Sequence, residues 1–391
     1  MRGLLSMLAL AVALAAHAAT TLMHDVLAPY VERGELPGAI SVLQCGGREE
    51  VACVGYADFT AKRPIALTNA FMQCSQTKGF CGVTVAKLVE EGRLDLDDPV
   101  AKYLPEFGNA MWVIESETNG VRTLVAATNA ISVRMAMNHT SGLPFELPCH
   151  ESCGWNHRMP LRNVAAEAAA LPLRFQPGTA VKYSNIGIDI GAAVVQRIVG
   201  MPWEDYLKRA VLDPLDMKDT TFWPTEAQLA DKIEGYNTKE GGPPHHTRQF
   251  GPMPLPYNGP TVFPSAGAGL WTTAEDQLKF FRMLMNLGVG DNGVRILKEE
   301  TVRNVLGKSS RPLGMPNYSL GFWCSDDGWI GHGGAWGNEM QVNFNTKRLD
   351  VWIVQLGCGP RPWEKARGEA RSQFFREASA PSSSEYTGRL E

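Results

Sequence analysis

The strand-forming segments of this chain lie near its two ends, and a long helical stretch separates them. Residues 38–44 and 50–58 flank a Gly46-Gly47 turn as two strands, and four further strand patterns fall between residues 319 and 357. Antiparallel strands from both ends can share one sheet, so the middle must be inserted into it. We therefore predict an α/β fold with an antiparallel sheet flanked by helices and an inserted, mostly helical lobe.

The predicted boundaries follow from this pattern. Residues 19–70 and 265–378 form a discontinuous α/β lobe, and residues 71–264 form the helical lobe. The helical lobe contains one hairpin, which turns at Asn119-Gly120. A cleft between two lobes is the default place for a functional site.

Helix boundaries have their own signals. The segment 21–34 has apolar residues at helical spacing and should end at Gly34. A capping box at Thr272-Thr273-Ala274-Glu275 should begin another helix, which stops at Gly288. The segment 362–378 predicts a last helix that packs on the sheet.

The two chain ends look different from the rest. Residues 1–18 resemble a cleavable export signal, with Arg2, an apolar run and a small-residue cleavage site at Ala16-His17-Ala18. No later apolar run is long enough to span a membrane. We expect an exported, periplasmic or secreted protein whose residues 379–391 form a disordered tail.

Charge excludes two classes of partner. The net charge is −4, the pI is about 6.1, and no Lys/Arg-rich run occurs. Nucleic acid and anionic membranes are therefore not expected partners. A small molecule or a peptide is the expected substrate.

Eight cysteines in an exported chain permit disulfides, but the sequence leaves their pairing open. The Gly46-Gly47 turn argues against one pair, because Cys45 then faces Arg48 and Cys53 faces Ile40.

Two groups of histidines raise the question of a metal. Cys149, His150, Cys153 and His157 lie close enough in sequence to ligate zinc. A Cys149–Cys153 disulfide, or ordinary loop residues, is favoured in an exported chain. His245-His246 lies in a Pro/Gly-rich loop, where solvated side chains are favoured. We assign no metal and no cofactor.

Ser75 is the only serine of the chain with a lysine three residues later, Lys78. Positions i and i+3 share one helix face, so the lysine can reach the serine hydroxyl. Serine needs a neighbouring base to act as a nucleophile. Lys78 can be that base near pH 7 only if its pKa falls by about 3 units from about 10.4, through burial or nearby positive potential.

Two further segments carry suitable chemistry. Tyr183-Ser184-Asn185 is the only Tyr-x-Asn in the chain, and a phenol near a lysine can move a proton while an amide can hold a substrate. His332-Gly333-Gly334 follows an apolar strand and precedes Ala335. Glycines there let backbone N–H groups approach a ligand. Taken singly, a core tyrosine with a capping asparagine and a glycine-rich turn would explain these segments.

Taken together and in this order, the three elements resemble the active-site serine penicillin-recognising enzymes, which include class C β-lactamases, D,D-peptidases and related esterases. Connecting segments such as "GAISVLQCGG", "LVEEGRLDLDDPVAKYLPEF", "MNHTSGLP", "FQPGTAVKYSN" and "PSAGAGLWTTAEDQ" are similar to those of that family, so the resemblance covers nearly all of the chain after residue 18.

The resemblance implies a role for each motif residue. Ser75 would be the acylated nucleophile, Lys78 its base, and Tyr183 the group that protonates the leaving group and activates the deacylating water. Asn185 would bind the acyl side of the substrate. His332, Gly333, Gly334 and Ala335 would line the substrate, with the N–H groups of Ser75 and Ala335 forming the oxyanion hole.

His332 departs from the β-lactamase pattern, which usually has lysine at that place. An unperturbed histidine is mostly neutral at pH 7 and holds a carboxylate less well than an ammonium does. We therefore expect a serine hydrolase that acts on an ester or an amide. A β-lactamase or D,D-carboxypeptidase, and a non-catalytic binder of cell-wall peptide or lipid, are the alternatives. An α/β-hydrolase is excluded, because the chain has no G-x-S-x-G.

Overall fold

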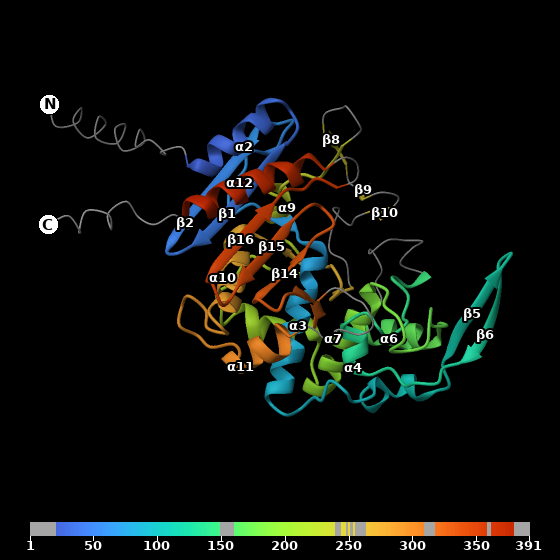
Figure 1. Cartoon of the computed structure of the whole chain (residues 1–391). Coiled ribbons are helices and arrows are strands. Elements are labelled where there is room, and N and C mark those ends of the chain that lie inside the picture. Colours follow the sequence, from blue (N-terminus) through green and yellow to red (C-terminus); the bar gives the residue numbers. More distant parts are fainter. Residues whose placement is uncertain are drawn as a thin grey trace, which may run out of the picture.

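A computed structural model describes residues 21–148, 160–238, 244–247, 249–250, 253–254, 263–308, 317–357 and 361–378. Its centre is an eight-stranded sheet in the order β12-β13-β14-β15-β16-β1-β2-β3, whose neighbouring strands are antiparallel (Figure 1). The strands are β1 Gly38–Cys45, β2 Arg48–Asp58, β3 Arg63–Pro64, β12 Tyr318–Ser319, β13 Phe322–Cys324, β14 Trp329–Gly333, β15 Glu339–Asn343 and β16 Arg348–Ile353.

The pairing of β1 with β16 joins the two ends of the chain in one sheet, as the sequence predicts. The hairpin of β1 and β2 has the predicted register, with Ile40 opposite Cys53 and Cys45 opposite Arg48. Gly46 and Gly47 both have positive φ angles, of 58° and 81°, which is the conformation that this two-residue turn requires. Cys45 and Cys53 are free thiols.

Helices cover both faces of the sheet (Figure 1). The helices α2 (Leu22–Glu32) and α12 (Pro362–Ala378) pack on one face with Ala39 and Leu43 of β1. The intervening Ile40 and Val42 point to the other face, into a core that includes α3 (Thr77–Glu90) and α10 (Ala274–Met285). This alternation is the period of two that a strand imposes.

The remaining elements of the described chain are short or helical. They are η1 Cys74–Gln76, η2 Val100–Lys102, η3 Pro105–Gly108, α4 Val133–Met137, α6 Leu161–Ala170, α7 Asn185–Val199, α8 Trp203–Leu207, η4 Lys208–Leu212, α9 Glu226–Ala230, α11 Glu299–Thr301 and η5 Val302–Leu306. The short strand pairs are β4 Phe71–Met72 with β11 Trp271–Thr272, β5 Trp112–Thr118 with β6 Val121–Ala126, β7 Tyr236–Asn237 with β8 His245–His246, and β9 Gln249–Phe250 with β10 Met253–Pro254.

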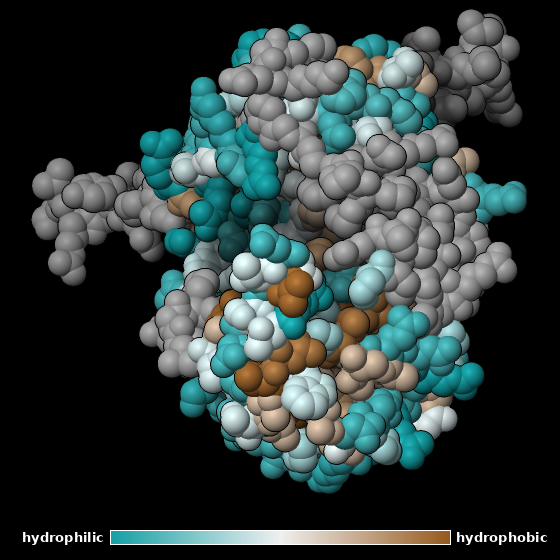
Figure 2. Space-filling model, turned by 90° about the vertical axis from the view of Figure 1, so that its right-hand side faces the viewer, coloured by the Kyte–Doolittle hydropathy of each residue, from teal (hydrophilic) through white to brown (hydrophobic). Residues whose placement is uncertain are grey.

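One hydrophobic core runs from the sheet into α3, α7 and α8, and it includes residues from both predicted lobes. The lobe boundaries at residues 70 and 265 therefore stay a prediction. The predicted hairpin at Asn119-Gly120 is confirmed, and it projects from the body (Figure 1). Trp112 and Val121 of this hairpin are 50% and 72% exposed. Figure 2 looks at the molecule from the side on which the hairpin projects and shows apolar side chains gathered over part of that surface.

One predicted helix cap is wrong by one residue. The cap of α10 is Thr273, whose side chain accepts a hydrogen bond from the backbone N–H of Asp276, and not Thr272. Thr272 pairs with Phe71 in the β4–β11 ladder, so its backbone belongs to a strand. The helix ends at Met285, close to the predicted stop at Gly288. Gly288 has a φ of 93°, a left-handed conformation that cannot continue the helix.

The remaining predictions concern the chain ends and the histidine loop. The predicted export signal and C-terminal tail lie outside the described residues. In the part of the chain that the structure describes, no helix is long and apolar enough to cross a membrane. His245 and His246 are exposed in the short strand β8, and Nε2 of His246 lies 3.0 Å from a carboxylate oxygen of Glu234.

Candidate active site

Ser75 lies in the tight turn η1, directly before α3, and Lys78 lies in the first turn of that helix. The preceding residue, Cys74, is buried and has a φ of 52°. α3 lies close to the sheet. A Cβ atom on Gly82 would lie 1.7 Å from the carbonyl oxygen of Leu320, so only glycine fits there. This close approach places α3 directly against the turn between β12 and β13.

Lys78 is completely buried, and its ammonium group has three oxygen partners. Nζ lies 3.2 Å from Oγ of Ser75, 2.5 Å from Oδ1 of Asn185 and 2.6 Å from the carbonyl oxygen of Gly267. Burial lowers the pKa of Lys78 from 10.5 to about 7, against the opposing charges of Asp189 and Glu146. A lysine with this pKa can accept a proton from a serine near neutral pH.

Tyr183 lies just before α7, and its ring lies close to the same ammonium group. Nζ of Lys78 is 4.5 Å from the centre of the Tyr183 ring. Burial raises the pKa of Tyr183, and a hydrogen bond with Ser75 partly lowers it again. Tyr183 is therefore a neutral phenol that contacts the predicted nucleophile.

His332 points from β14 toward two tyrosine hydroxyls. Its Nδ1 lies 2.6 Å from the carbonyl oxygen of Gly333 and must therefore carry the hydrogen. Nε2 is then an acceptor, and the hydroxyls of Tyr183 and Tyr318 each lie 3.4 Å from it. Burial, and then the charge of Lys78, lowers the pKa of His332 to about 3. The ring is neutral at pH 7.

The glycine segment after His332 docks on the turn that carries Ser75. The N–H of Gly334 donates to the carbonyl oxygen of Asn338 over 2.7 Å, and a Cβ on Gly334 would lie 2.5 Å from the carbonyl oxygen of Gln73. Nε2 of Gln76 donates to the carbonyl oxygen of His332 over 3.3 Å. This approach requires glycine at position 334.

The structure thus brings Ser75, Lys78, Tyr183, Asn185 and the segment 332–335 together, although they are far apart in the sequence. Ala335 is exposed beside them. The roles of Gly333 and Ala335 toward a substrate stay predictions. Asn185 has both ends of its amide engaged, since Oδ1 accepts from Lys78 and Nδ2 donates to Oε1 of Glu146.

Sequence reasoning missed two buried carboxylates, Glu146 and Asp189. Asp189 lies within a run of apolar residues in α7, and a carboxylate in such a run is the signal that could have revealed it. Its Oδ1 accepts from the N–H of Gly267 over 3.1 Å. The segment containing Glu146 gave no such signal.

Sequence reasoning also missed His139, which has a φ of 68°. Its ring lies 4.4 Å from that of Tyr183, and its Nδ1 accepts from the N–H of Ser184 over 3.2 Å. Burial lowers the pKa of His139 well below 6.5, so its ring is a neutral wall of the site.

The cysteines beside Lys78 are buried. Burial raises the pKa of Cys74 to about 12 and that of Cys81 well above 9, so both are neutral thiols. Cys149, His150, Cys153 and His157 lie outside the described residues. Among the residues that are described, no three His, Cys, Asp or Glu side chains form a group that could hold a metal ion.

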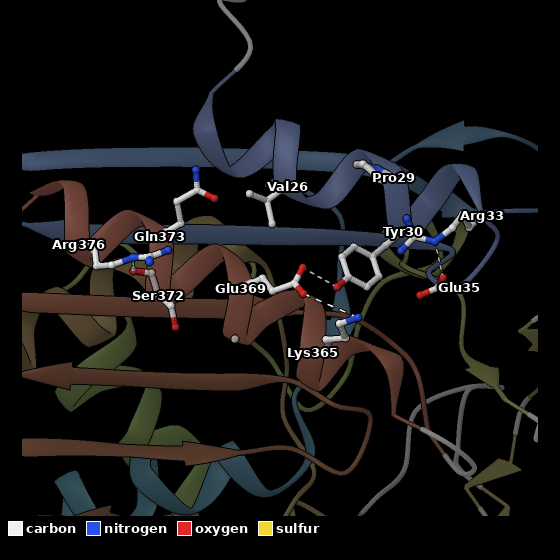
Figure 3. A pocket seen from close by; sticks show the side chains of 11 residues that line it. Val26, Pro29, Tyr30, Arg33, Glu35, Lys365, Glu369, Ser372, Gln373 and Arg376 are labelled. Carbon is white, nitrogen blue, oxygen red and sulfur yellow. Dashed lines mark hydrogen bonds and ion pairs between the residues drawn. The ribbon is translucent and has the colours of Figure 1, made fainter.

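Two hollows differ in their relation to the site. One, of about 290 Å³, is lined by His332, Gly333 and residues of β13 and β15, and it adjoins the predicted site. The other, of about 910 Å³, lies between α2 and α12 (Figure 3). There the hydroxyl of Tyr30 donates to Glu369 over 2.6 Å, and none of the predicted site residues lines this hollow.

The fold agrees with the comparison to known families. The model of the family named Beta-lactamase matches residues 23–355, so the chain belongs to that family. The protein Rv1367c of Mycobacterium tuberculosis (strain ATCC 25618 / H37Rv) is 32% identical over 286 residues, which cover 70% of this chain and 68% of the relative.

Two solved structures show the same fold. Simvastatin synthase (LovD) from Aspergillus terreus, as its LovD6 mutant, has a TM-score of 0.73 with 20% identity, over 93% of this chain and 99% of that one. EstCE1, titled a hydrolase with promiscuous acyltransferase activity, has a TM-score of 0.69 with 20% identity, over 89% of this chain and 97% of that one. The predicted fold and the predicted family are confirmed.

Proposed function

We propose that this protein is a serine hydrolase that forms an acyl-enzyme on Ser75 and acts on neutral esters or amides. The observation that carries the proposal is the buried Lys78, whose Nζ lies 3.2 Å from Oγ of Ser75 and whose pKa is lowered to about 7. A serine so placed has the neighbouring base that it needs.

In the proposed reaction, Oγ of Ser75 attacks the carbonyl carbon of the substrate while its proton passes to Lys78. The negative charge that develops on the carbonyl oxygen faces the N–H groups of Ser75 and Ala335. The C–O or C–N bond to the leaving group then breaks, and Tyr183 gives the leaving group a proton that it regains from Lys78. Water then attacks the acyl carbon and passes a proton through Tyr183 to Lys78. The bond from the acyl carbon to Oγ of Ser75 breaks, Oγ takes the proton back from Lys78, and the acid leaves.

The preference for neutral substrates is inferred from His332. Its pKa is lowered to about 3, so a substrate carboxylate would meet an uncharged ring there instead of a lysine ammonium. Asn185 gives a separate reason against β-lactams and cell-wall peptides as substrates. Its amide holds Lys78 and Glu146 and is 3% exposed, which leaves little of it for the acylamino group of a β-lactam or a cell-wall peptide. Export remains part of the proposal, and it is supported by the signal-like residues 1–18.

The test compares wild type with Ser75→Ala on p-nitrophenyl acetate, p-nitrophenyl butyrate and nitrocefin. We expect wild type to hydrolyse the esters faster than nitrocefin, and Ser75→Ala to lose turnover of both esters while folding normally. Ser372→Ala on α12 is the matched control and should keep wild-type rates. Unchanged ester turnover in Ser75→Ala would contradict the mechanism, and preference for nitrocefin would favour a β-lactamase.

A further inference from the structure

Two buried carboxylates accept hydrogen bonds from Asn185 and Gly267, two of the residues whose oxygen atoms contact Lys78. Oδ1 of Asn185 accepts from Lys78 over 2.5 Å, and the Nδ2 of the same amide donates to Glu146, which is 4% exposed. The carbonyl oxygen of Gly267 accepts from Lys78 over 2.6 Å, and the N–H of Gly267 donates over 3.1 Å to Asp189, which is 0% exposed. Two of the three oxygen partners of Lys78, on Asn185 and Gly267, therefore belong to residues that are each held by one carboxylate.

The two carboxylates come from different parts of the fold. Glu146 lies in the segment before residue 149, and Asp189 lies near the start of α7, which is capped by Ser184. Asp189 also accepts from Oγ of Ser265 over 3.2 Å, so it fixes two points of the segment that carries Gly267. Loss of either carboxylate would release one oxygen partner of Lys78.

The other groups that face Lys78 carry no charge at neutral pH. Burial raises the pKa of the Cys74 thiol of η1 and the Cys81 thiol of α3, and it lowers the pKa of His139 and of His332 on β14. Tyr183 is a neutral phenol. Among the described residues that act on Lys78, the negative charge thus comes from Glu146 and Asp189.

We propose that Glu146 and Asp189 are positioning residues for the general base: Glu146 orients the Asn185 amide, Asp189 orients the Gly267 carbonyl, and their charges make Lys78 a stronger base than burial alone would. The inference rests on the proposed function of Lys78. Burial alone would leave the lysine neutral and too weak a base, whereas a base works best when its pKa is close to the working pH.

The proposal predicts the direction of a pH shift. Glu146→Gln keeps an oxygen that can accept from Asn185 and removes only the charge. The pKa of Lys78 should then fall, and the acidic limb of the kcat/KM profile should move to lower pH by about half to one unit. At one pH unit below the midpoint of the wild-type acidic limb, kcat/KM is compared as a fraction of each protein's own plateau. This fraction should be about three- to five-fold higher in the variant than in wild type.

Asp189 gives a second, separate test. Asp189→Asn keeps an acceptor for the N–H of Gly267 and should shift the acidic limb in the same direction. Asp189→Ala removes that acceptor, so the Gly267 carbonyl loses its anchor, and kcat should fall by about 10²-fold, the scale of a misplaced catalytic group. A merely structural role would lower activity in all three variants without moving the pH profile.

The measurement is the pH dependence of two rates, kcat/KM for p-nitrophenyl acetate and the second-order labelling of Ser75 by a fluorophosphonate. Glu204→Gln in α8 is the matched control, because Glu204 is a partly buried carboxylate that is not among the groups that act on Lys78. Its profile should match wild type. Circular dichroism checks folding. If Glu146→Gln does not fold, the pH profile of Asp189→Asn tests the inference by itself.

An acidic limb that stays in place or moves to higher pH in Glu146→Gln and Asp189→Asn overturns the inference. Failure of the proposed function has a different signature. In that case wild type itself is neither labelled on Ser75 nor active on the ester, whereas an active, labelled wild type with unmoved variant profiles rejects the inference alone.

Discussion

Replacement of Lys78 by methionine tests the burial of this lysine through protein stability. The side chain is 0% exposed, and its pKa falls from 10.5 to about 7 on folding. Between these two values the unfolded chain binds more protons than the folded protein, so the contribution of Lys78 to the free energy of unfolding rises with pH. Methionine has a similar length and no proton to bind.

The size of the effect follows from the pKa difference of about 3.5 units, at about 1.4 kcal/mol per unit. At pH 7 the buried lysine costs the folded state about 4 kcal/mol, and at pH 9 about 2 kcal/mol. Methionine leaves the oxygens of Asn185 and Gly267 without their donor, which costs about 1–3 kcal/mol for each group and is the same at both pH values. The change with pH in the stability difference between Lys78→Met and wild type therefore reports the protonation of Lys78 alone.

The assay is urea unfolding of wild type and Lys78→Met at pH 7, 8 and 9. The stability of the variant relative to wild type should decrease by about 2 kcal/mol from pH 7 to pH 9. Lys87→Met is the control, because Lys87 lies on the same helix with a partly exposed side chain and should show no comparable trend. A difference between Lys78→Met and wild type that stays constant over this range would refute the reasoning.

Three further changes probe the site. His332→Lys supplies the cation that the neutral ring lacks, so the ratio of nitrocefin to p-nitrophenyl acetate turnover should rise, and an unchanged ratio would reject His332 as a determinant of substrate charge. Tyr183→Phe should lower kcat/KM on the ester by about 10²–10⁴-fold with an unchanged circular dichroism spectrum, and a loss of less than two-fold would remove Tyr183 from proton transfer. Gly334→Ala places a Cβ 2.5 Å from the carbonyl oxygen of Gln73 and should lower both activity and thermal stability. Gly368→Ala in α12 has no atom within 4 Å of the new Cβ and should instead stabilise the protein by about 0.5–1 kcal/mol, so equal effects of the two alanines would contradict the close approach.

The fold was predictable because its main signals are local. The Gly46-Gly47 turn fixes the register of the first hairpin, and strand patterns at both ends imply one sheet. The cap of α10 was misplaced by one residue, since Thr272 and Thr273 are both good capping residues and only the tertiary pairing of Thr272 with Phe71 distinguishes them.

The site was predictable only in its three motifs. Ser75 lies in η1 and Lys78 in the first turn of α3, and the chain keeps turning in one helical sense between them, so their contact follows from the i, i+3 spacing. The contacts of Lys78 with Asn185 and Gly267 depend on how α3, α7 and a distant loop pack, which periodicity does not encode. Glu146 and Asp189 contact Asn185 and Gly267, which in turn contact Lys78. No pattern of sequence spacing therefore connects these carboxylates to Ser75.

The most direct test of the proposed mechanism is the mass of the intact protein after brief reaction with p-nitrophenyl acetate and, in parallel, with a fluorophosphonate. Wild type should gain the mass of one acyl or one phosphonyl group, and peptide mapping should place each adduct on Ser75. Ser75→Ala should gain neither. An adduct on another residue, or equal labelling of Ser75→Ala, would contradict the assignment of Ser75 as the nucleophile.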